Sequence, residues 1–251
     1  MVGILALIDR FIGEAKNGRF SISVPGNLEV TGHLKKVRFL EALEKFGAIS
    51  GEGRGSIEPD EDSPFFPIMV GQTEGWVDEV VGLIVDQCQH KFQGIASLLD
   101  PVYTIFAELA SNAVQHSECG RVWVLAQYYA KSRMIEIAVA DSGISIPQSL
   151  RRNPDLHGRV GPDVEAVSLA FEEGTSGLDD PNRGGLHHIR NELSVNERKL
   201  LIRSGTGSVT VYHDGRLRLN VCGHCWHPCQ MYNPVRLSQT QNVEQLWNPS
   251  T

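Results

Sequence analysis

Two neighbouring segments with apolar residues at every second position constrain the fold of this 251-residue chain more than any other feature. In Arg121 to Tyr128 and in Met134 to Ala140, this spacing gathers apolar side chains on one face of an extended segment. The two segments are close enough in the chain to pair as an antiparallel hairpin. Three more short strands are expected nearer the C-terminus, at Lys199 to Ser204, Ser208 to His213 and Arg216 to Val221.

Helical spacing dominates much of the remaining chain. Apolar residues three and four positions apart predict helices at Ile4 to Ile12, Val30 to Phe46, Trp76 to Phe92 and Leu186 to Leu193. Phe20 to Val24 alternates and is expected to form a strand. The combination predicts an α+β fold: a two-layer sandwich of a mixed, mainly antiparallel sheet with helices on one face, plus a small N-terminal α/β segment.

Residues 48 to 66 form the best candidate for a boundary, because they are rich in glycine and contain the acidic run Glu58 to Asp62. We therefore expect an N-terminal α/β regulatory segment at residues 1–66, a main domain at residues 67–221 and a Cys/His-rich tail at residues 222–251.

Charge and cysteine content limit the classes of partner. The net charge is −7, so long-range repulsion disfavours binding to nucleic acid or to an anionic membrane. The chain contains five cysteines, and we find neither an export signal nor an apolar run long enough to span a bilayer. A cytoplasmic protein with reduced thiols is expected.

A polar stripe marks one of the helical segments. Glu108, Asn112 and His116 recur at every fourth residue, and each such step advances only about 40° around a helix. An asparagine oxygen can ligate Mg²⁺, and a carboxylate one turn away can accept a proton from a nucleophile. A solvated polar edge would show the same spacing, so the stripe alone leaves both interpretations open.

Two further elements have the composition of nucleotide-binding loops. Asp141 ends an expected strand, and Gly143 follows two residues later. A carboxylate at the first position can accept a hydrogen bond from an exocyclic base amine, and a glycine at the second lets the backbone approach a planar ring. Arg183-Gly184-Gly185-Leu186 leads into an expected helix, whose N-terminal amides suit a phosphate. A simple turn and a flexible lid are the alternative interpretations.

The order and spacing of these elements resemble the GHKL ATPase superfamily, which includes gyrase, the ninety-kilodalton heat-shock chaperones, sensor histidine kinases and mismatch-repair ATPases. Glu108-x-x-x-Asn112-Ala-x-x-His116 resembles the N box of that superfamily. Asp141-x-Gly143-x-x-Ile146-Pro147 and Arg183-Gly184-Gly185-Leu186 resemble its two glycine boxes, and Gly205 to Thr210 resembles its last glycine element. The resemblance covers about residues 95 to 221 and is closest to stand-alone bacterial ATP-binding proteins and anti-sigma-factor serine kinases.

The resemblance implies a Bergerat-type fold and a Mg-ATP site. Asp141 would hold adenine, Asn112 would hold Mg²⁺, and the Gly184-Gly185 turn would hold phosphates under a lid near residues 174 to 184. Glu108 would act as the general base. The resemblance also extends the nucleotide site to His116, Gly143, Ile146, Arg183, Leu186 and Ser208.

Three departures bear on turnover. The first glycine box usually has a second glycine where Ser145 stands, and the second box usually reads Gly-Leu-Gly-Leu where this chain has Gly185-Leu186-His187-His188. These departures affect turnover more than nucleotide binding, because they leave Asp141 and Asn112 in place.

A separate Cys/His cluster suggests a metal site. Cys222, Cys225 and Cys229 lie within eight residues together with two histidines, a density that suits Zn²⁺, although the paired pattern of a zinc ribbon is absent. A reduced tail without metal is the alternative.

Two main hypotheses follow. One is an ATPase or serine/threonine protein kinase of the GHKL type that uses Glu108 as a base and has a protein partner or substrate. The other is a nucleotide-sensing interaction module without turnover.

Overall fold

The computed structural model describes residues 1–14, 26–44, 66–91, 96–116, 118, 121–129, 134–176, 185–193 and 198–221, and these residues form an α+β protein. The helices in the described ranges are α1 (Val2–Glu14), α2 (Leu28–Lys36), α3 (Phe39–Glu44), α4 (Glu74–Lys91), α5 (Ala96–His116), α6 (Ile146–Arg152), α7 (Asp163–Leu169) and α8 (Gly185–Leu193). The strands are β1 (Met69–Gly71), β2 (Val122–Tyr129), β3 (Met134–Asp141), β4 (Lys199–Ser204), β5 (Gly207–Tyr212) and β6 (Leu217–Val221). None of the helices within these ranges has the length and apolar character needed to cross a bilayer.

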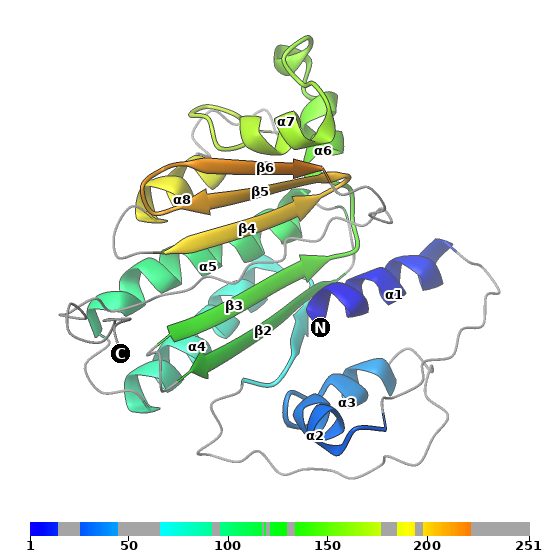
Figure 1. Cartoon of the computed structure of the whole chain (residues 1–251), viewed down its shortest axis with the longest axis vertical. Coiled ribbons are helices and arrows are strands. Elements are labelled where there is room, and N and C mark those ends of the chain that lie inside the picture. Colours follow the sequence, from blue (N-terminus) through cyan, green and yellow to red (C-terminus); the bar gives the residue numbers. More distant parts are fainter. Residues whose placement is uncertain are drawn as a thin grey trace, which may run out of the picture.

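The predicted hairpin is confirmed as the centre of the first sheet. β2 pairs with β3 in antiparallel register from Val122 opposite Asp141 to Tyr129 opposite Met134, and β1 pairs with the other edge of β2. The alternating residues of both strands face a large core shared with the helices α4, α5 and α8. This helical layer lies behind the strands in Figure 1.

The three predicted C-terminal strands are also confirmed, but they form a second antiparallel sheet in the order β4-β5-β6. The amide of Ile146, which follows β3, donates to Ser204 Oγ at the end of β4 over 2.8 Å. The start of α6 therefore lies next to the C-terminal end of β4, and one core supports both sheets. Two small sheets thus replace the single mixed sheet expected, while the α+β class is confirmed.

The N-terminal helices cover the opposite face of the first sheet. Val2, Leu5, Ala6 and Ile8 of α1 are buried in a second core, which is completed by apolar residues of α3 and of the sheet. The sheet contributes Trp123 and Leu125 from β2 and Ala138 and Ala140 from β3. Both faces of the hairpin are therefore apolar, which explains why β2 is buried at almost every position.

The helix predicted over Val30 to Phe46 is wrong as a single element, because the chain turns between α2 and α3. Arg38 adopts a left-handed conformation with φ of 55°, which interrupts helical hydrogen bonding, and Val37 caps the end of α2. The turn places Val37 and Leu43, both apolar residues of the predicted helical segment, in the second core. Tertiary burial therefore outweighs the local periodicity here.

Several predicted segments lie outside the described residues. These are the strand at Phe20 to Val24, most of the boundary segment at residues 48–66 and the tail at residues 222–251.

Candidate functional site

The polar stripe of the sequence lies along α5. Glu108, Asn112 and His116 are each half-buried at the margin of the main core, where Leu109 and Ala113 are buried. Asn112 Nδ2 donates to Glu108 Oε1 over 3.2 Å. This bond fixes the amide plane and leaves the Asn112 carbonyl oxygen, the atom type that Mg²⁺ prefers, outside the contact.

Asp141 is the last residue of β3 and is completely buried. It shares the strand face of Ile137 and Val139, which belong to the core that α5 also lines, so its carboxylate lies on the helical side of the sheet. Its Oδ1 accepts from the Gly143 amide over 2.9 Å, which closes a tight turn. A carboxylate has acceptor capacity for more than one such bond, so this turn is compatible with recognition of an exocyclic amine.

Ser145 stands where the first glycine box of the family usually has a second glycine. Its backbone is extended, with φ of −74° and ψ of 156°, so no glycine is required there. Its hydroxyl accepts from the Gln148 amide over 3.2 Å and caps α6. Ser145 therefore defines the start of α6.

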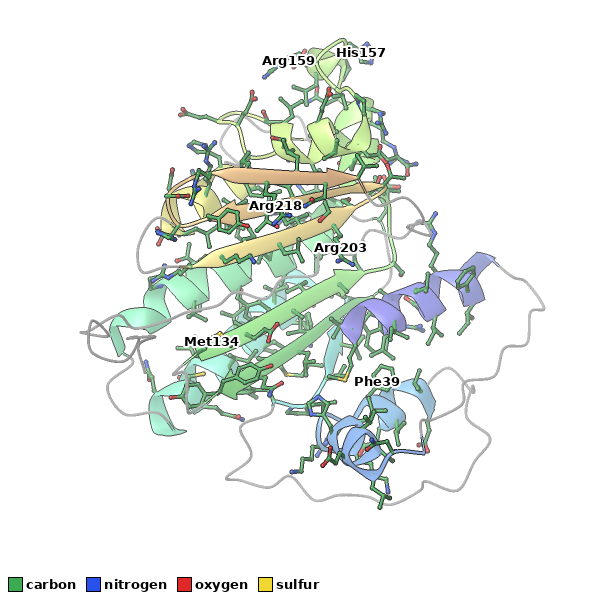
Figure 2. All side chains as sticks on the ribbon, viewed as in Figure 1. Phe39, Met134, His157, Arg159, Arg203 and Arg218 are labelled. Atoms are coloured by element: carbon green, nitrogen blue, oxygen red, sulfur yellow. The ribbon has the colours of Figure 1, made fainter. Side chains whose placement is uncertain are left out.

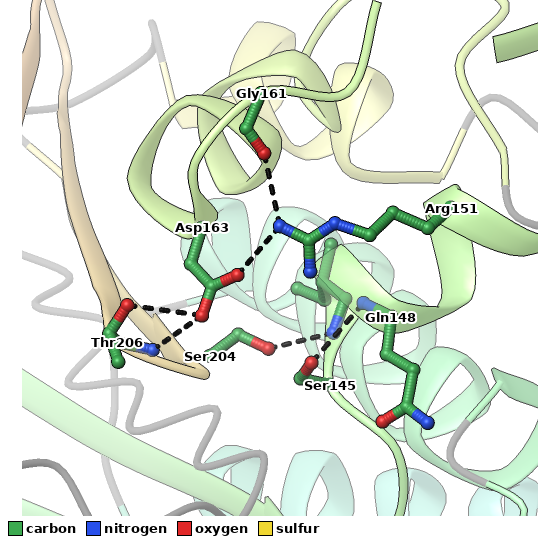
Figure 3. Close-up of polar contacts among 8 residues, drawn as sticks. Ser145, Gln148, Arg151, Gly161, Asp163, Ser204 and Thr206 are labelled. Carbon is green, nitrogen blue, oxygen red and sulfur yellow. Dashed lines mark hydrogen bonds and ion pairs between the residues drawn. The ribbon is translucent and has the colours of Figure 1, made fainter. Parts of the chain in front are cut away.

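A partly exposed polar network ties α6, α7 and the β4–β5 turn together, as Figure 3 shows. Asp163 Oδ2 accepts from the amide and the hydroxyl of Thr206, at 2.9 and 3.1 Å. Arg151 Nη2 donates to Asp163 Oδ1 over 2.9 Å and to the Gly161 carbonyl over 3.0 Å. Burial alone raises the pKa of Asp163, but the bonds from Thr206 and Arg151 outweigh it and lower the pKa below 3.8.

Helix α8 presents two different sides. Leu186, Ile189 and Leu193 are buried in the main core, whereas His187 is half-buried. His187 Nδ1 lies 3.3 Å from the Phe171 carbonyl oxygen, and its Nε2 lies 3.4 Å from Asn191 Nδ2. A carbonyl can only accept and the amide nitrogen can only donate, so these contacts assign the proton to Nδ1. The imidazole is thus held at the start of α8.

The remaining predicted site residues are placed as follows. Ile146 begins α6, and Ser208 is buried in β5 opposite Arg203 and Asn220. Gly185 begins α8. Arg183, Gly184 and most of the predicted lid lie outside the described residues, as do Cys222, Cys225 and Cys229. Within the described ranges, no group of three or more His, Cys, Asp or Glu side chains is arranged to hold a metal ion.

Residues outside the predicted motifs also shape the loop after β3. Ser204 binds the Ile146 amide, and from α1 the side chains of Asp9 and Arg10 bind Ser142 and Gly143. One signal for Ser204 was available: it is a polar residue on the face of β4 that also carries Leu200 and Ile202. No local pattern marks the α1 contacts, because they join residues 133 positions apart.

Comparison with protein families gives one match. The family model described as Histidine kinase-, DNA gyrase B-, and HSP90-like ATPase matches residues 98–211. The matched range begins in α5 and ends in β5, so it includes Glu108, Asn112 and Asp141. Searches of curated proteins and of solved structures gave no match.

Proposed function

Because residues 98–211 form a domain of the histidine kinase-, DNA gyrase B- and HSP90-like ATPase family, which binds ATP, we propose that this protein binds Mg-ATP and transfers its terminal phosphoryl group to water or to a protein serine or threonine. The observation that carries the proposal is the Glu108–Asn112 pair on α5, on the same side of the sheet as the buried Asp141. This pair offers an amide oxygen and a carboxylate one helical turn apart.

The polar groups of these residues suit the parts of a nucleotide. Asp141 would accept from the adenine amine, and the carbonyl oxygen of Asn112 would ligate Mg²⁺. The bound nucleotide supplies the phosphoryl group, and its metal ion offsets the phosphate charge. The N-terminal amides of α8 would donate to phosphate oxygens, which matters for a protein of net charge −7 because amides attract an anion without a basic patch.

Glu108 would act on the attacking group. Its carboxylate would take the proton from the water or the hydroxyl as that oxygen bonds to phosphorus, and the ADP oxygen would leave. The hydrogen bond from Asn112 holds the carboxylate in one orientation, and the other carboxylate oxygen remains for the nucleophile.

Nucleotide sensing without turnover is the second candidate function. His187 is fixed in the first turn of α8, where the family pattern has a glycine, so an imidazole stands where phosphates would approach. In this interpretation ATP would change a protein-binding surface and would not be consumed.

Two substitutions test the proposal. Asp141→Asn is expected to abolish Mg-ATP binding in calorimetry, while Asp155→Asn, at an exposed position, should bind as the wild type does.

Glu108→Gln keeps an oxygen for the Asn112 bond but removes the base. Mg-ATP affinity should therefore persist, while single-turnover phosphate release or protein labelling falls by about 10²- to 10⁴-fold. Glu79→Gln, on the exposed side of α4, is the matched control.

The outcomes separate the candidates. Wild-type affinity in Asp141→Asn would contradict the adenine site. Tight Mg-ATP binding by the wild type with neither phosphate release nor labelled protein would favour the sensing module over the enzyme.

A further inference from the structure

We propose that Asp9 and Arg10 of α1 are positioning residues of the nucleotide site, which makes the N-terminal helix a part of adenine recognition. They would act by fixing the loop Asp141–Gly143, and the inference rests on the proposed role of Asp141 in binding adenine.

Hydrophobic packing sets the rotation of α1. Leu5 and Ala6 are buried against the outer face of the first sheet. Asp9 and Arg10 follow these two residues by four positions, so they lie on the same side of the helix one turn later. Figure 1 shows α1 on the opposite side of the hairpin from α4 and α5. The packing that buries α1 therefore also delivers two charged side chains to the end of β3.

The two side chains bind consecutive residues of the loop. Asp9 Oδ2 accepts from Ser142 Oγ over 2.9 Å, and Arg10 Nη1 donates to the Gly143 carbonyl over 3.2 Å. The Asp9 side chain is only 13% exposed, so its bonds are screened little by solvent.

A third residue holds Asp9 in place. Arg121 Nη1 donates to Asp9 Oδ1 over 2.5 Å. Arg121 immediately precedes β2, and the pairing of Val122 with Asp141 brings the start of β2 to the end of β3. Asp9 therefore joins α1 to both strands of the hairpin at the position where Asp141 turns inward.

The contacts divide the loop between two faces of the sheet. On the helical side, Asp141 binds the Gly143 amide, and on the other side α1 binds the Gly143 carbonyl and the Ser142 hydroxyl. The backbone at Gly143 is thus held from both sides of the sheet. Because the Asp141 carboxylate accepts from the Gly143 amide, its orientation is held as well. Loss of the α1 contacts would leave the carboxylate present but less well oriented for a planar base.

The experiment separates base recognition from phosphate recognition in the full chain. Displacement of a fluorescent ATP analogue is measured with Mg-ATP, with adenosine and with Mg-tripolyphosphate, for the wild type, Asp9→Ala, Arg10→Ala and Arg10→Lys. Arg10→Ala and Asp9→Ala are expected to weaken ATP and adenosine binding by about tenfold each, the scale of one charge-assisted hydrogen bond, and to leave tripolyphosphate affinity unchanged. Arg10→Lys should recover most of the loss.

Arg159→Ala is the matched control. Arg159 forms an ion pair with Glu172, and Figure 2 places it with His157 at the outer end of the loop between α6 and α7, far from α1. It should leave all three affinities unchanged.

The outcomes distinguish failure of the proposed function from failure of the positioning role. A wild type that does not bind ATP would contradict the proposed function. ATP binding in the wild type with equal affinities in folded Arg10→Ala and Asp9→Ala would overturn the positioning role alone, and so would an equal loss for adenosine and tripolyphosphate. If the α1 variants do not fold, Ser142→Ala removes the Asp9 contact from the loop side. It should weaken adenosine binding selectively, and unchanged binding would overturn the inference.

Discussion

At the scale of single residues, Asp163 shows how one carboxylate organises a turn. It lies in the first turn of α7, where the helix dipole favours a negative charge, and it holds Thr206 in the β4–β5 turn. Arg151 neutralises it from α6. The turn belongs to the segment that resembles the last glycine element of the family pattern, so Asp163 would support that element of the proposed site without being part of the motif.

The pH dependence of stability should reveal this role. The pKa of Asp163 is lowered in the folded state, so its contribution to the free energy of unfolding is complete above the ordinary value of 3.8 and is lost as the pH falls through the folded pKa. At pH 7, Asp163→Asn should reduce the free energy of unfolding by about 1–3 kcal/mol in urea titrations. The difference from the wild type should shrink below pH 4, and a difference that persists unchanged at pH 3 would contradict the account.

At the scale of elements, a glycine in β5 allows close packing of a neighbouring helix, whereas a glycine in α4 faces open space. A Cβ on Gly207 would lie 2.7 Å from the Asp163 backbone oxygen and 2.8 Å from the Val164 Cα, so α7 approaches β5 because this residue has no side chain. At Gly82 in α4, apart from the two neighbouring residues and the surrounding backbone of the helix itself, no heavy atom of the described residues lies within 4 Å of the corresponding position.

A pair of alanine substitutions tests this difference. Gly207→Ala should lower the free energy of unfolding by about 1–3 kcal/mol, because backbone atoms must move. Gly82→Ala should raise it by about 0.5–1 kcal/mol, since alanine restricts the unfolded chain and favours the helix. Urea midpoints at constant m-value measure both. A neutral Gly207→Ala would show that α7 does not pack closely on β5.

At the scale of the whole molecule, the first sheet lies between two cores. One core contains α4, α5 and α8, and the other contains α1 and α3. Trp123 and Val124 are adjacent in β2 and belong to different cores, so each core depends on the same strands. We therefore propose that the N-terminal helices unfold together with the ATP-binding part, whatever the boundary near residue 66.

Substitutions in the two cores test cooperativity. Leu5→Ala and Ile105→Ala remove fully buried side chains from the second and first core, and each should cost about 2–5 kcal/mol. Both should shift one transition, with coincident midpoints in far-ultraviolet circular dichroism and tryptophan fluorescence. Ile4→Ala, at a position that is 51% exposed, is the control and should change little. A separate early transition confined to Leu5→Ala would show that α1 belongs to an independent unit.

The elements of the ATP-binding part were predictable because their signals are local. The alternation in β2 and β3 and the four-residue spacing of Glu108 and Asn112 follow from the geometry of a strand and a helix. The turn at Arg38 was not predictable, since it depends on burying Val37 and Leu43 against a surface formed by distant residues.

By itself, the sequence determined the α+β class, the hairpin and the order of the nucleotide-binding elements, because each of these depends on residue types at short spacing. Only the tertiary structure decided that the strands form two sheets, that both faces of the first sheet are buried and that Asp9 and Arg10 bind the loop after Asp141. The contacts of Asp9 and Arg10 join residues 133 positions apart. Their energy is gained only when both packing surfaces exist, so no local pattern records them.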